Sequence, residues 1–421
     1  MRRWLGLALA VASVASVASA CSLAHPTKDP LVIGAVYPLA GAQGPGGIDE
    51  HRGVLLAADL VNQSGGVNGL PVEIRSVDAE GSDAAAGAVS TLANEGVRIV
   101  LGSYGSTISG PASAEAARRG MLFWETGAVG MLPPASDLGG LTFRVPPTGE
   151  VLGRAAIHYI ASQVAPTLHR EPSSLRFAVS YVDDVYGRSV AAGGESALRA
   201  SGLKDVGNFG YHLASVNMAE LVHRIAAAKP DVLFVSAYLK DAIALRRQIV
   251  KQRVPLLANI GTSSSYCMPA FGKTLGKDAV GVYASDKPSA SSIDPSALLP
   301  VARALLARAD AAYRTRWGQS MSPAALAGFS AAWALFTDVL PAAASDDPSA
   351  VADAARAADL PAGSLPNGSG LRFGARGTAT AGDNLAAASV IWRWVSPGHA
   401  SVIWPPAFAT APMDPSQSDA W

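Results

Sequence analysis

Residue types that could carry catalysis occur in the chain, but they do not stand at the spacings that catalysis needs. The seven His are scattered, and the sequence has no Cys-x-x-Cys or His-x-x-x-His pair, so we expect no metal site. Ser189 has Gly187 before it but Ala191 where a nucleophile elbow needs its second Gly. Gly272-Lys273-Thr274 lacks the first Gly of a phosphate loop, because Cys267 stands at that position. These absences argue against an enzyme and against a bound cofactor.

Cys21 is the residue with the most direct chemical prediction. A pair of arginines precedes an uncharged apolar run, which ends in Ala18-Ser19-Ala20-Cys21. This order predicts a secretory signal peptide over residues 1–20. A Cys directly after small residues resembles a lipobox, in which the Cys is acylated, although Ala18 stands where lipoboxes usually have Leu. We therefore expect an exported cell-envelope lipoprotein, in the periplasm or on the outer face of the cytoplasmic membrane, tethered by acyl chains and a linker over 21–30. The alternative is ordinary cleavage with a free Cys21.

Charge and length exclude some classes of function. The chain has 421 residues, with 33 Lys and Arg against 33 Asp and Glu and no basic run, which argues against nucleic acid as a partner. Roughly 400 mature residues exceed one ordinary hydrophobic core, so two domains are expected. If Cys21 is acylated, Cys267 has no partner for a disulfide.

Strands alternate with helices along the first third of the chain. We expect buried strands at residues 31–37, 72–77, 98–101 and 121–124, and helices at residues 51–62, 84–95 and 111–118. The Gly- and Pro-rich residues 41–48 are expected to form a loop. Such alternation is typical of a parallel, doubly wound sheet.

The alternation restarts near residue 143 and predicts a second sheet of the same kind. Its expected strands are residues 176–181, 205–212, 231–236, 256–260 and 279–285. Residues 295–360 are expected to be almost all helix, and strands at 389–395 and 400–404 to follow them. Residues 407–421 are expected to form a disordered tail. The predicted fold class is therefore α/β, with two doubly wound parallel-sheet lobes.

Several short stretches resemble one known family in their order and spacing. They are Ile33–Gly41, Arg52-Gly53, Gly65–Val72, Val100–Ser106, Tyr186-Gly187 after Asp183-Asp184, and Ile391–Trp394 with Val402–Pro405. Together they resemble the leucine/isoleucine/valine-binding family of ABC-importer solute-binding proteins, over nearly all of the mature chain. The resemblance implies a type I periplasmic binding protein fold with a three-crossover hinge. Lobe one would comprise residues 31–146 and 285–385, and lobe two residues 147–284 and 386–406.

The resemblance also implies ligand contacts in lobe one, in loops beyond the carboxyl ends of the strands. Ser106 matches the position that hydrogen-bonds a ligand carboxylate, in a loop that also holds Tyr104 and Thr107. A hydroxyl beside a helix N-terminus suits an anion, and a plain helix cap is the alternative. The next such loop runs from Glu125 through Ala128, and Val129 follows where the family carries a Thr. Glu125 would hold a cation or a donor group of the ligand, or would instead form a salt bridge or lie at the surface.

In lobe two the resemblance points to three further ligand contacts. Tyr186 and Tyr238 match tyrosines that pack over the ligand, a task that suits a ring with a broad apolar face and a polar tip. Ser263 falls where the family carries the acid that binds the ligand ammonium group, and no carboxylate stands in Gly261–Tyr266. Either Glu125 replaces that acid from the opposite lobe, or the ligand is an amide, a urea-like or aromatic compound, or another small polar molecule.

Three functions fit these observations. The first is the solute-binding subunit of an ABC importer, which works with permease and ATPase subunits and catalyses no reaction. The second is an accessory ligand-sensing receptor of the same fold. The third is a hydrolase that uses Glu125 with a serine of the cleft, which no nucleophile–base motif supports.

Overall fold

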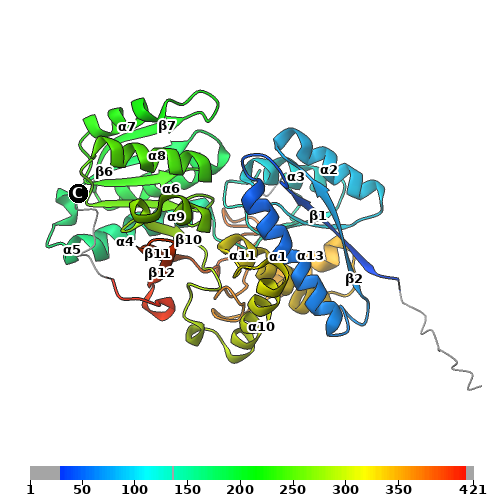
Figure 1. Ribbon diagram of the computed structural model, residues 1–421. Coiled ribbons are helices and arrows are strands. Elements are labelled where there is room, and N and C mark those ends of the chain that lie inside the picture. Colours follow the sequence, from blue (N-terminus) through cyan, green and yellow to red (C-terminus); the bar gives the residue numbers. More distant parts are fainter. Residues whose placement is uncertain (1–28, 135–136, 414–421) are drawn as a thin grey trace, which may run out of the picture.

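The computed structural model describes residues 29–134 and 137–413, which form two α/β lobes side by side (Figure 1). The predicted signal peptide, Cys21 and most of the predicted linker lie outside the described residues. Each lobe contains a sheet with helices on both sides, so the predicted fold class is confirmed. The buried apolar side chains form separate clusters in the two lobes, and each sheet therefore has a core of its own.

The sheet of lobe one has five parallel strands in the order β2-β1-β3-β4-β5. The strands are β1 (Leu31–Tyr37), β2 (Val72–Asp78), β3 (Ile99–Gly102), β4 (Leu122–Glu125) and β5 (Thr142–Arg144). Its helices are α1 (Gly44–Gln63), α2 (Ser82–Asn94), α3 (Ser106–Arg118), α10 (Pro300–Trp317), α11 (Pro323–Ala334) and α13 (Pro348–Ala357). All four residues of β3 and of β4 are buried, which is typical of parallel strands covered on both faces.

The closest helix packing in lobe one joins α1 to α11, and glycines make it possible. A Cβ on Gly53 would overlap the backbone of Ala325, and a Cβ on Gly328 would overlap the backbone of Glu50. Helix α11 continues through a π-helical segment (Leu335–Val339) into α12 (Leu340–Ala342). The combined helix, Pro323–Ala342, is long and apolar enough to cross a membrane, but 83% of its most apolar window is buried in the protein, as expected for a core helix.

The sheet of lobe two has seven strands in the order β12-β11-β10-β9-β8-β6-β7. The strands are β6 (Arg176–Val182), β7 (Lys204–Tyr211), β8 (Val232–Ser236), β9 (Ala258–Thr262), β10 (Tyr283–Asp286), β11 (Val390–Ser396) and β12 (His399–Trp404). The helices are α4 (Gly149–Tyr159), which continues through a π-helical segment (Ile160–Val164) into α5 (Ala165–Thr167), then α6 (Val185–Ala200), α7 (Met218–Ala227), α8 (Leu239–Gln252) and α9 (Pro269–Leu275). Strands β6 to β10 are parallel, and β11 and β12 form an antiparallel hairpin at one edge.

The chain passes between the two sheets three times: after β5, after β10 and before β11. We propose the lobe boundaries given from the sequence, with the second crossing placed after Asp286, because β10 belongs to the sheet of lobe two. The predicted disordered tail is wrong for residues 407–413. A 3₁₀ turn forms at Pro406–Phe408, the Thr410 N–H donates to the Val402 carbonyl oxygen, and Met413 packs against the core of lobe two. Residues 414–421 lie outside the described residues.

Candidate ligand-binding site between the lobes

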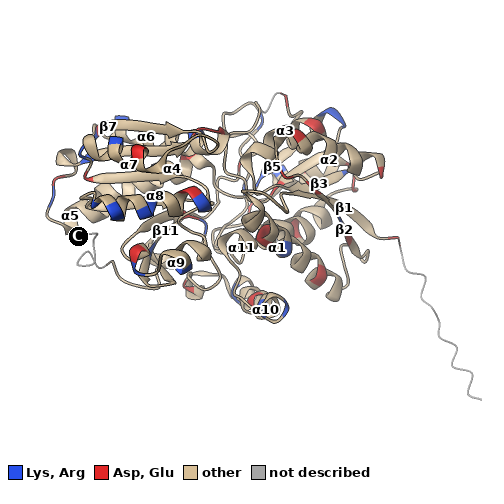
Figure 2. Ribbon diagram, turned by 45° about the horizontal axis from the view of Figure 1, so that its top comes forward, with Lys and Arg blue, Asp and Glu red and all other residues tan. Residues whose placement is uncertain are grey.

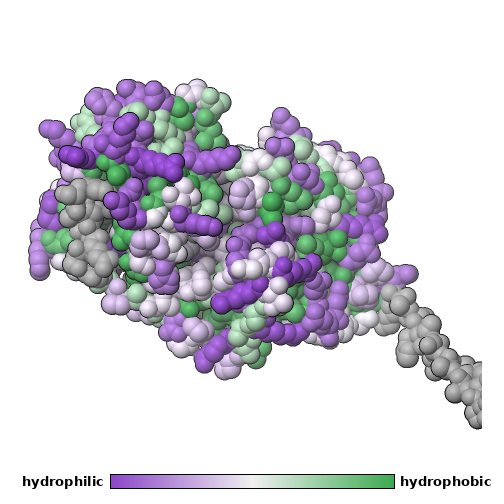
Figure 3. Space-filling view, viewed as in Figure 1, coloured by the Kyte–Doolittle hydropathy of each residue, from purple (hydrophilic) through white to green (hydrophobic). Residues whose placement is uncertain are grey.

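Loops at the carboxyl ends of the strands of both lobes meet where the lobes face each other. Helix α3 of lobe one contacts α6 of lobe two at this boundary, and the space-filling view shows a notch between the lobes (Figure 3). The Tyr104 hydroxyl of lobe one reaches the side chain of Ser264 in lobe two. The Lys287 ammonium group, directly after β10, donates to the carbonyl oxygen of Gly127 in lobe one at 2.9 Å. The described conformation is therefore one in which the two lobes touch.

Tyr104 reaches lobe two from a tightly held loop. Its φ is +59°, a left-handed backbone conformation that non-glycine residues adopt at a cost of about 1–3 kcal/mol. The Tyr104 N–H donates to Glu50 Oε1 at 3.1 Å, and the ring packs so closely on Gly46 that a Cβ there would overlap it. The side chain is 7% exposed. Contacts within lobe one thus aim the ring across the boundary.

Ser106 is the first residue of α3, whereas Gly105 is the N-cap, so the reading of Ser106 as a plain helix cap is wrong. The Ser106 Oγ accepts a hydrogen bond from the Gly130 N–H at 2.9 Å, which ties the loop after β3 to the loop after β4. Within the described residues the hydroxyl hydrogen has no acceptor, so it remains able to donate. Thr107, in contrast, accepts from Gln43 Nε2 at 2.8 Å and serves lobe one itself.

Glu125 is fully buried and binds its own lobe. The N–H groups of Gly127 and Ala128 donate to Oε1 at 2.8 and 2.7 Å, and the Ser103 N–H donates to both carboxyl oxygens at 2.9 and 3.0 Å. The Ser109 hydroxyl donates to Oε2. Burial raises the pKa of Glu125, and these donors lower it again in part. Among the described residues Glu125 forms no ion pair within 4 Å, although the Arg144 charge also lowers its pKa, and it does not lie at the surface. The Ala128 N–H is bound to this carboxylate.

The rings of Tyr186 and Tyr238 are neighbours in lobe two. The Tyr186 and Tyr238 rings have centroids 5.3 Å apart and are 2% and 5% exposed. The Tyr186 hydroxyl donates to the carbonyl oxygen of Ser263, and the Tyr238 hydroxyl donates to Asp184 Oδ2 at 2.7 Å. Both polar tips are therefore bound within lobe two, and the rings can offer a ligand their faces and edges. Ser263 itself is 4% exposed.

Glu50 belongs to the site but was not found from the sequence. It lies in α1, which begins at Gly44. The sequence predicted a loop at residues 41–48 and a helix only from residue 51, so Glu50 fell outside the predicted helix. Its Oε1 accepts from Thr126 Oγ1 at 2.6 Å, and the Tyr37 hydroxyl in turn bonds Thr126 at 2.6 Å. Within the described residues Glu50 Oε2 has no hydrogen-bond partner. Burial raises the pKa of Glu50 to about 8, although the nearby Lys287 charge lowers it.

Asp286 and Lys287 were also missed, although they are a charged pair directly after a predicted strand. Asp286 ends β10 and Lys287 begins the second crossing, and both are at most 2% exposed. A charged residue at the carboxyl end of a buried strand is the sequence signal that Asp286 shares with Glu125.

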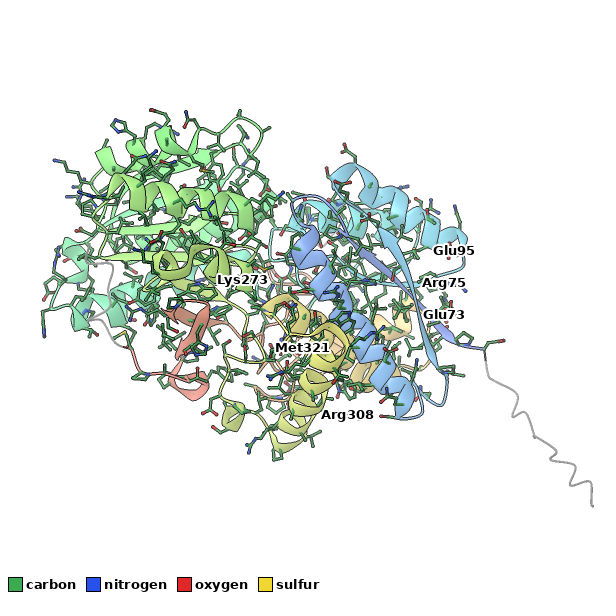
Figure 4. All side chains as sticks on the ribbon, in the orientation of Figure 1. Glu73, Arg75, Glu95, Lys273, Arg308 and Met321 are labelled. Carbon is green, nitrogen blue, oxygen red and sulfur yellow. The ribbon has the colours of Figure 1, made fainter. Side chains whose placement is uncertain are left out.

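Other charges and hollows lie away from these loops. Lys, Arg, Asp and Glu are spread over the outer helices of both lobes (Figure 2). Glu73, Arg75 and Glu95 gather at the outer edge of lobe one (Figure 4), where Arg75 pairs with both acids at 2.9 and 3.5 Å. A hollow of about 520 Å³ is lined by Tyr159, Trp404 and Met413, and none of the predicted ligand contacts lines it. In the described part of the chain, no group of three or more His, Cys, Asp and Glu could hold a metal ion.

A smaller cavity of about 190 Å³ lies beside the second crossing. Met321 of lobe one and Cys267 and Trp394 of lobe two line it. Figure 4 shows Met321 near the boundary between the lobes. The thiol of Cys267 also lies beside Asp286, so this cavity adjoins the candidate site.

Comparison with known proteins agrees with this architecture. The sequence profile of a periplasmic binding protein family matches residues 30–390. A Leu/Ile/Val-binding protein homolog of Brucella suis is 29% identical over 376 residues, which are 89% of this chain and 90% of that protein. A leucine-binding protein of Thermotoga maritima superposes with a TM-score of 0.73 at 15% identity, over 88% of this chain and 97% of that one. An ABC transporter substrate-binding protein of Desulfitobacterium hafniense in complex with Leu gives 0.67 at 21% identity, over 89% and 100%.

Proposed function

Because the chain belongs to the periplasmic binding protein family, we propose that it is the solute-binding subunit of an ABC importer and that it captures a small amino-acid-like molecule between its lobes. One observation carries the proposal. Aromatic, hydroxyl and buried charged groups converge from strand ends of both lobes at a boundary that three crossings join. A ligand held by both lobes stabilises the closed form, in which a permease would recognise it.

The proposed ligand class rests on complementary groups in the two lobes. In lobe one, the free donor hydrogen of Ser106 at the start of the 13-residue helix α3 suits a carboxylate. In lobe two, the faces of Tyr186 and Tyr238 suit an aliphatic or cationic portion of the ligand. The names of the Brucella relatives and the leucine in the Desulfitobacterium complex make branched-chain amino acids the first compounds to test. An amide or a urea-like compound is the alternative class.

The residues predicted from the sequence to bind the ligand fall into two groups, those that contact the ligand and those that hold the loops in place. We propose that Tyr104, Ser106, Tyr186 and Tyr238 contact the ligand directly, and that the loop at Ser263 borders it. Thr107, Glu125 and Ala128 hold the loops in place, since their side-chain or backbone groups are bound within lobe one. This removes the structural basis for a hydrolase, because the Glu125 carboxylate is surrounded by donors and is not placed to act as a base.

We further propose that the protein is a lipoprotein anchored through Cys21. A periplasmic binding protein acts outside the cytoplasm, and the small residues before Cys21 suit cleavage and acylation. The test is the variant Cys21→Ser, which should move the protein from the membrane fraction to the soluble fraction. Wild-type protein in the soluble fraction would refute the anchor.

Uptake by whole cells separates an importer from a sensor. A strain that lacks this protein should lose most high-affinity uptake of the labelled amino acid that the purified protein binds, and the wild-type gene should restore it. Unchanged uptake, together with altered expression of other genes in response to the same amino acid, would instead support the accessory sensing receptor.

A further inference from the structure

Asp286 is a buried carboxylate that lacks a strong hydrogen-bond donor. It ends β10, it is 1% exposed, and within the described residues neither Oδ1 nor Oδ2 has a hydrogen-bond partner. An ionised carboxylate that is removed from water without such partners is strongly unfavourable. A group with strong donors would therefore stabilise this carboxylate.

Other buried carboxylates near the site have donors of their own. Asp184 accepts from the Gly187 N–H and the Tyr238 hydroxyl at 2.9 and 2.7 Å. Asp241 accepts from the Tyr211 hydroxyl and from the Tyr238 N–H, and Glu125 has the donors given above. Asp286 thus differs from these acids, each of which stabilises a loop or a helix start.

The neighbours of Asp286 come from both lobes. Burial is the main reason that the pKa values of Tyr104 and Tyr186 are raised, and the nearby Asp286 charge contributes to both. The Cys267 thiol lies close enough to donate a hydrogen bond to the carboxyl group, but a thiol is only a weak donor. Lys287 is the next residue, yet its ammonium group donates to Gly127 in lobe one. The carboxylate therefore lies at the lobe boundary, near enough to Tyr104 and Tyr186 for its charge to act on both hydroxyl groups, and it forms no ion pair within 4 Å among the described residues.

We infer that Asp286 accepts hydrogen bonds from an ammonium group of the bound solute. An ammonium group has three donors and a positive charge, which meet the two requirements of a buried carboxylate. The rings of Tyr104 and Tyr186, whose hydroxyl groups feel the Asp286 charge, would also attract a cation. Asp286 would then supply the acid that the loop Gly261–Tyr266 lacks. This assignment replaces the hypothesis that Glu125 supplies it. The inference rests on the proposed function and narrows its ligand to a primary amine with a carboxylate.

The first arm of the test needs no ligand. Asp286→Asn removes a buried charge that has no strong donor, so the ligand-free variant should unfold at a temperature equal to or above that of the wild type. The control is Asp310→Asn, because buried Asp310 accepts from Ser320 Oγ and the Met321 N–H at 2.7 and 2.8 Å. The control should unfold at a lower temperature. A drop for Asp286→Asn as large as that of the control would show a structural role and overturn the inference.

The second arm measures binding by calorimetry to protein refolded free of ligand, with L-leucine and its deaminated counterpart 4-methylpentanoate as the first matched pair. Each further amino acid that stabilises the wild type is paired in the same way. Asp286→Asn should weaken amino-acid binding by roughly 30-fold or more, and should change binding of the deaminated acid by less than about threefold. Asp310→Asn should change neither.

The outcomes separate the two claims. Equal affinities of wild type and Asp286→Asn for the amino acid, or equal losses for both members of the pair, would overturn the inference and leave the proposed function standing. A wild type that binds no amino acid would refute the proposed ligand class and the inference with it.

Discussion

Lys287 donates to the carbonyl oxygen of Gly127 at 2.9 Å and thereby connects the second crossing of the hinge to the loop after β4. Lys287 is 2% exposed, and its charge also lowers the pKa of Glu50 in the same region. Lys287 therefore links the hinge to lobe one by a hydrogen bond and also acts electrostatically on the buried Glu50.

Replacement of Lys287 by Met should favour the open form and weaken ligand binding. The Gly127 carbonyl would lose its donor, at a cost of about 1–3 kcal/mol. We expect amino-acid affinity to fall about tenfold, as measured by calorimetry. The control is Lys273→Met, since Lys273 is exposed on α9. Equal affinities of the two variants would show that the Lys287–Gly127 contact does not stabilise the ligand-bound form.

Glu50→Gln should change how stability depends on pH. The folded protein holds the Glu50 proton up to a pKa of about 8, whereas the unfolded chain releases it near 4.5. The contribution of the Glu50 proton to folding stability is complete below about pH 4.5. As the pH rises from there toward 8, the free energy of unfolding falls by up to about 1.4 kcal/mol per pH unit. Because Gln cannot ionise, the variant does not lose stability in this way as the pH rises.

Urea unfolding at pH 5, 6.5 and 8 measures the effect. The stability of Glu50→Gln relative to the wild type should increase with each step in pH. Parallel pH profiles for the two proteins would mean that Glu50 ionises as easily in the folded state as in the unfolded chain.

Glu125→Gln should reduce stability and leave ligand selectivity unchanged. The amide would replace a charged acceptor for three backbone N–H groups, and we expect a loss of about 1–3 kcal/mol in the free energy of unfolding. Glu95→Gln is the exposed control and should change stability by less than about 0.5 kcal/mol. A variant of normal stability that binds a different class of solute would restore Glu125 as a ligand-binding residue.

Tyr238→Phe and Tyr238→Ala should differ in ligand binding. The hydroxyl of Tyr238 donates to Asp184, so Phe keeps the ring face and should change affinity by less than about threefold. Ala removes a ring that is 5% exposed, and should weaken binding at least tenfold and cost about 3–5 kcal/mol of folding stability. Calorimetry and urea unfolding give both quantities. Equal affinity losses in the two variants would place the hydroxyl, not the ring, at the ligand.

The fold could be predicted from the sequence because local patterns determine most of it. Fully buried strands such as β3 and β8 appear as continuous apolar runs, and helices between them indicate a parallel sheet. The start of α1 was missed because Gly44, Gly46 and Gly47 are typical of loops. They occur there for packing, since a Cβ on Gly46 would overlap Tyr104 and a Cβ on Gly47 would overlap Pro38.

The roles of the site residues were harder to predict, because they depend on partners far away in the sequence. Glu125 looked available for a ligand, yet its donors include Ser103 and Ser109 from the neighbouring loop and helix. Asp286 directly follows the predicted strand at residues 279–285, and only the folded structure shows that it is buried without a strong donor. Sequence patterns indicated which loops form the site, but not which of their charges are already satisfied.

Thermal unfolding tests most directly whether the protein binds an amino acid. The protein, refolded free of ligand, is unfolded in the presence of each of the twenty amino acids and of matched amides, ureas and deaminated acids. A ligand at 100 times its dissociation constant stabilises a protein by about 2.7 kcal/mol. We expect a clear rise in the unfolding temperature with at least one amino acid and a smaller rise with its deaminated counterpart. A rise with amides or ureas alone, or with no compound at all, would contradict this expectation.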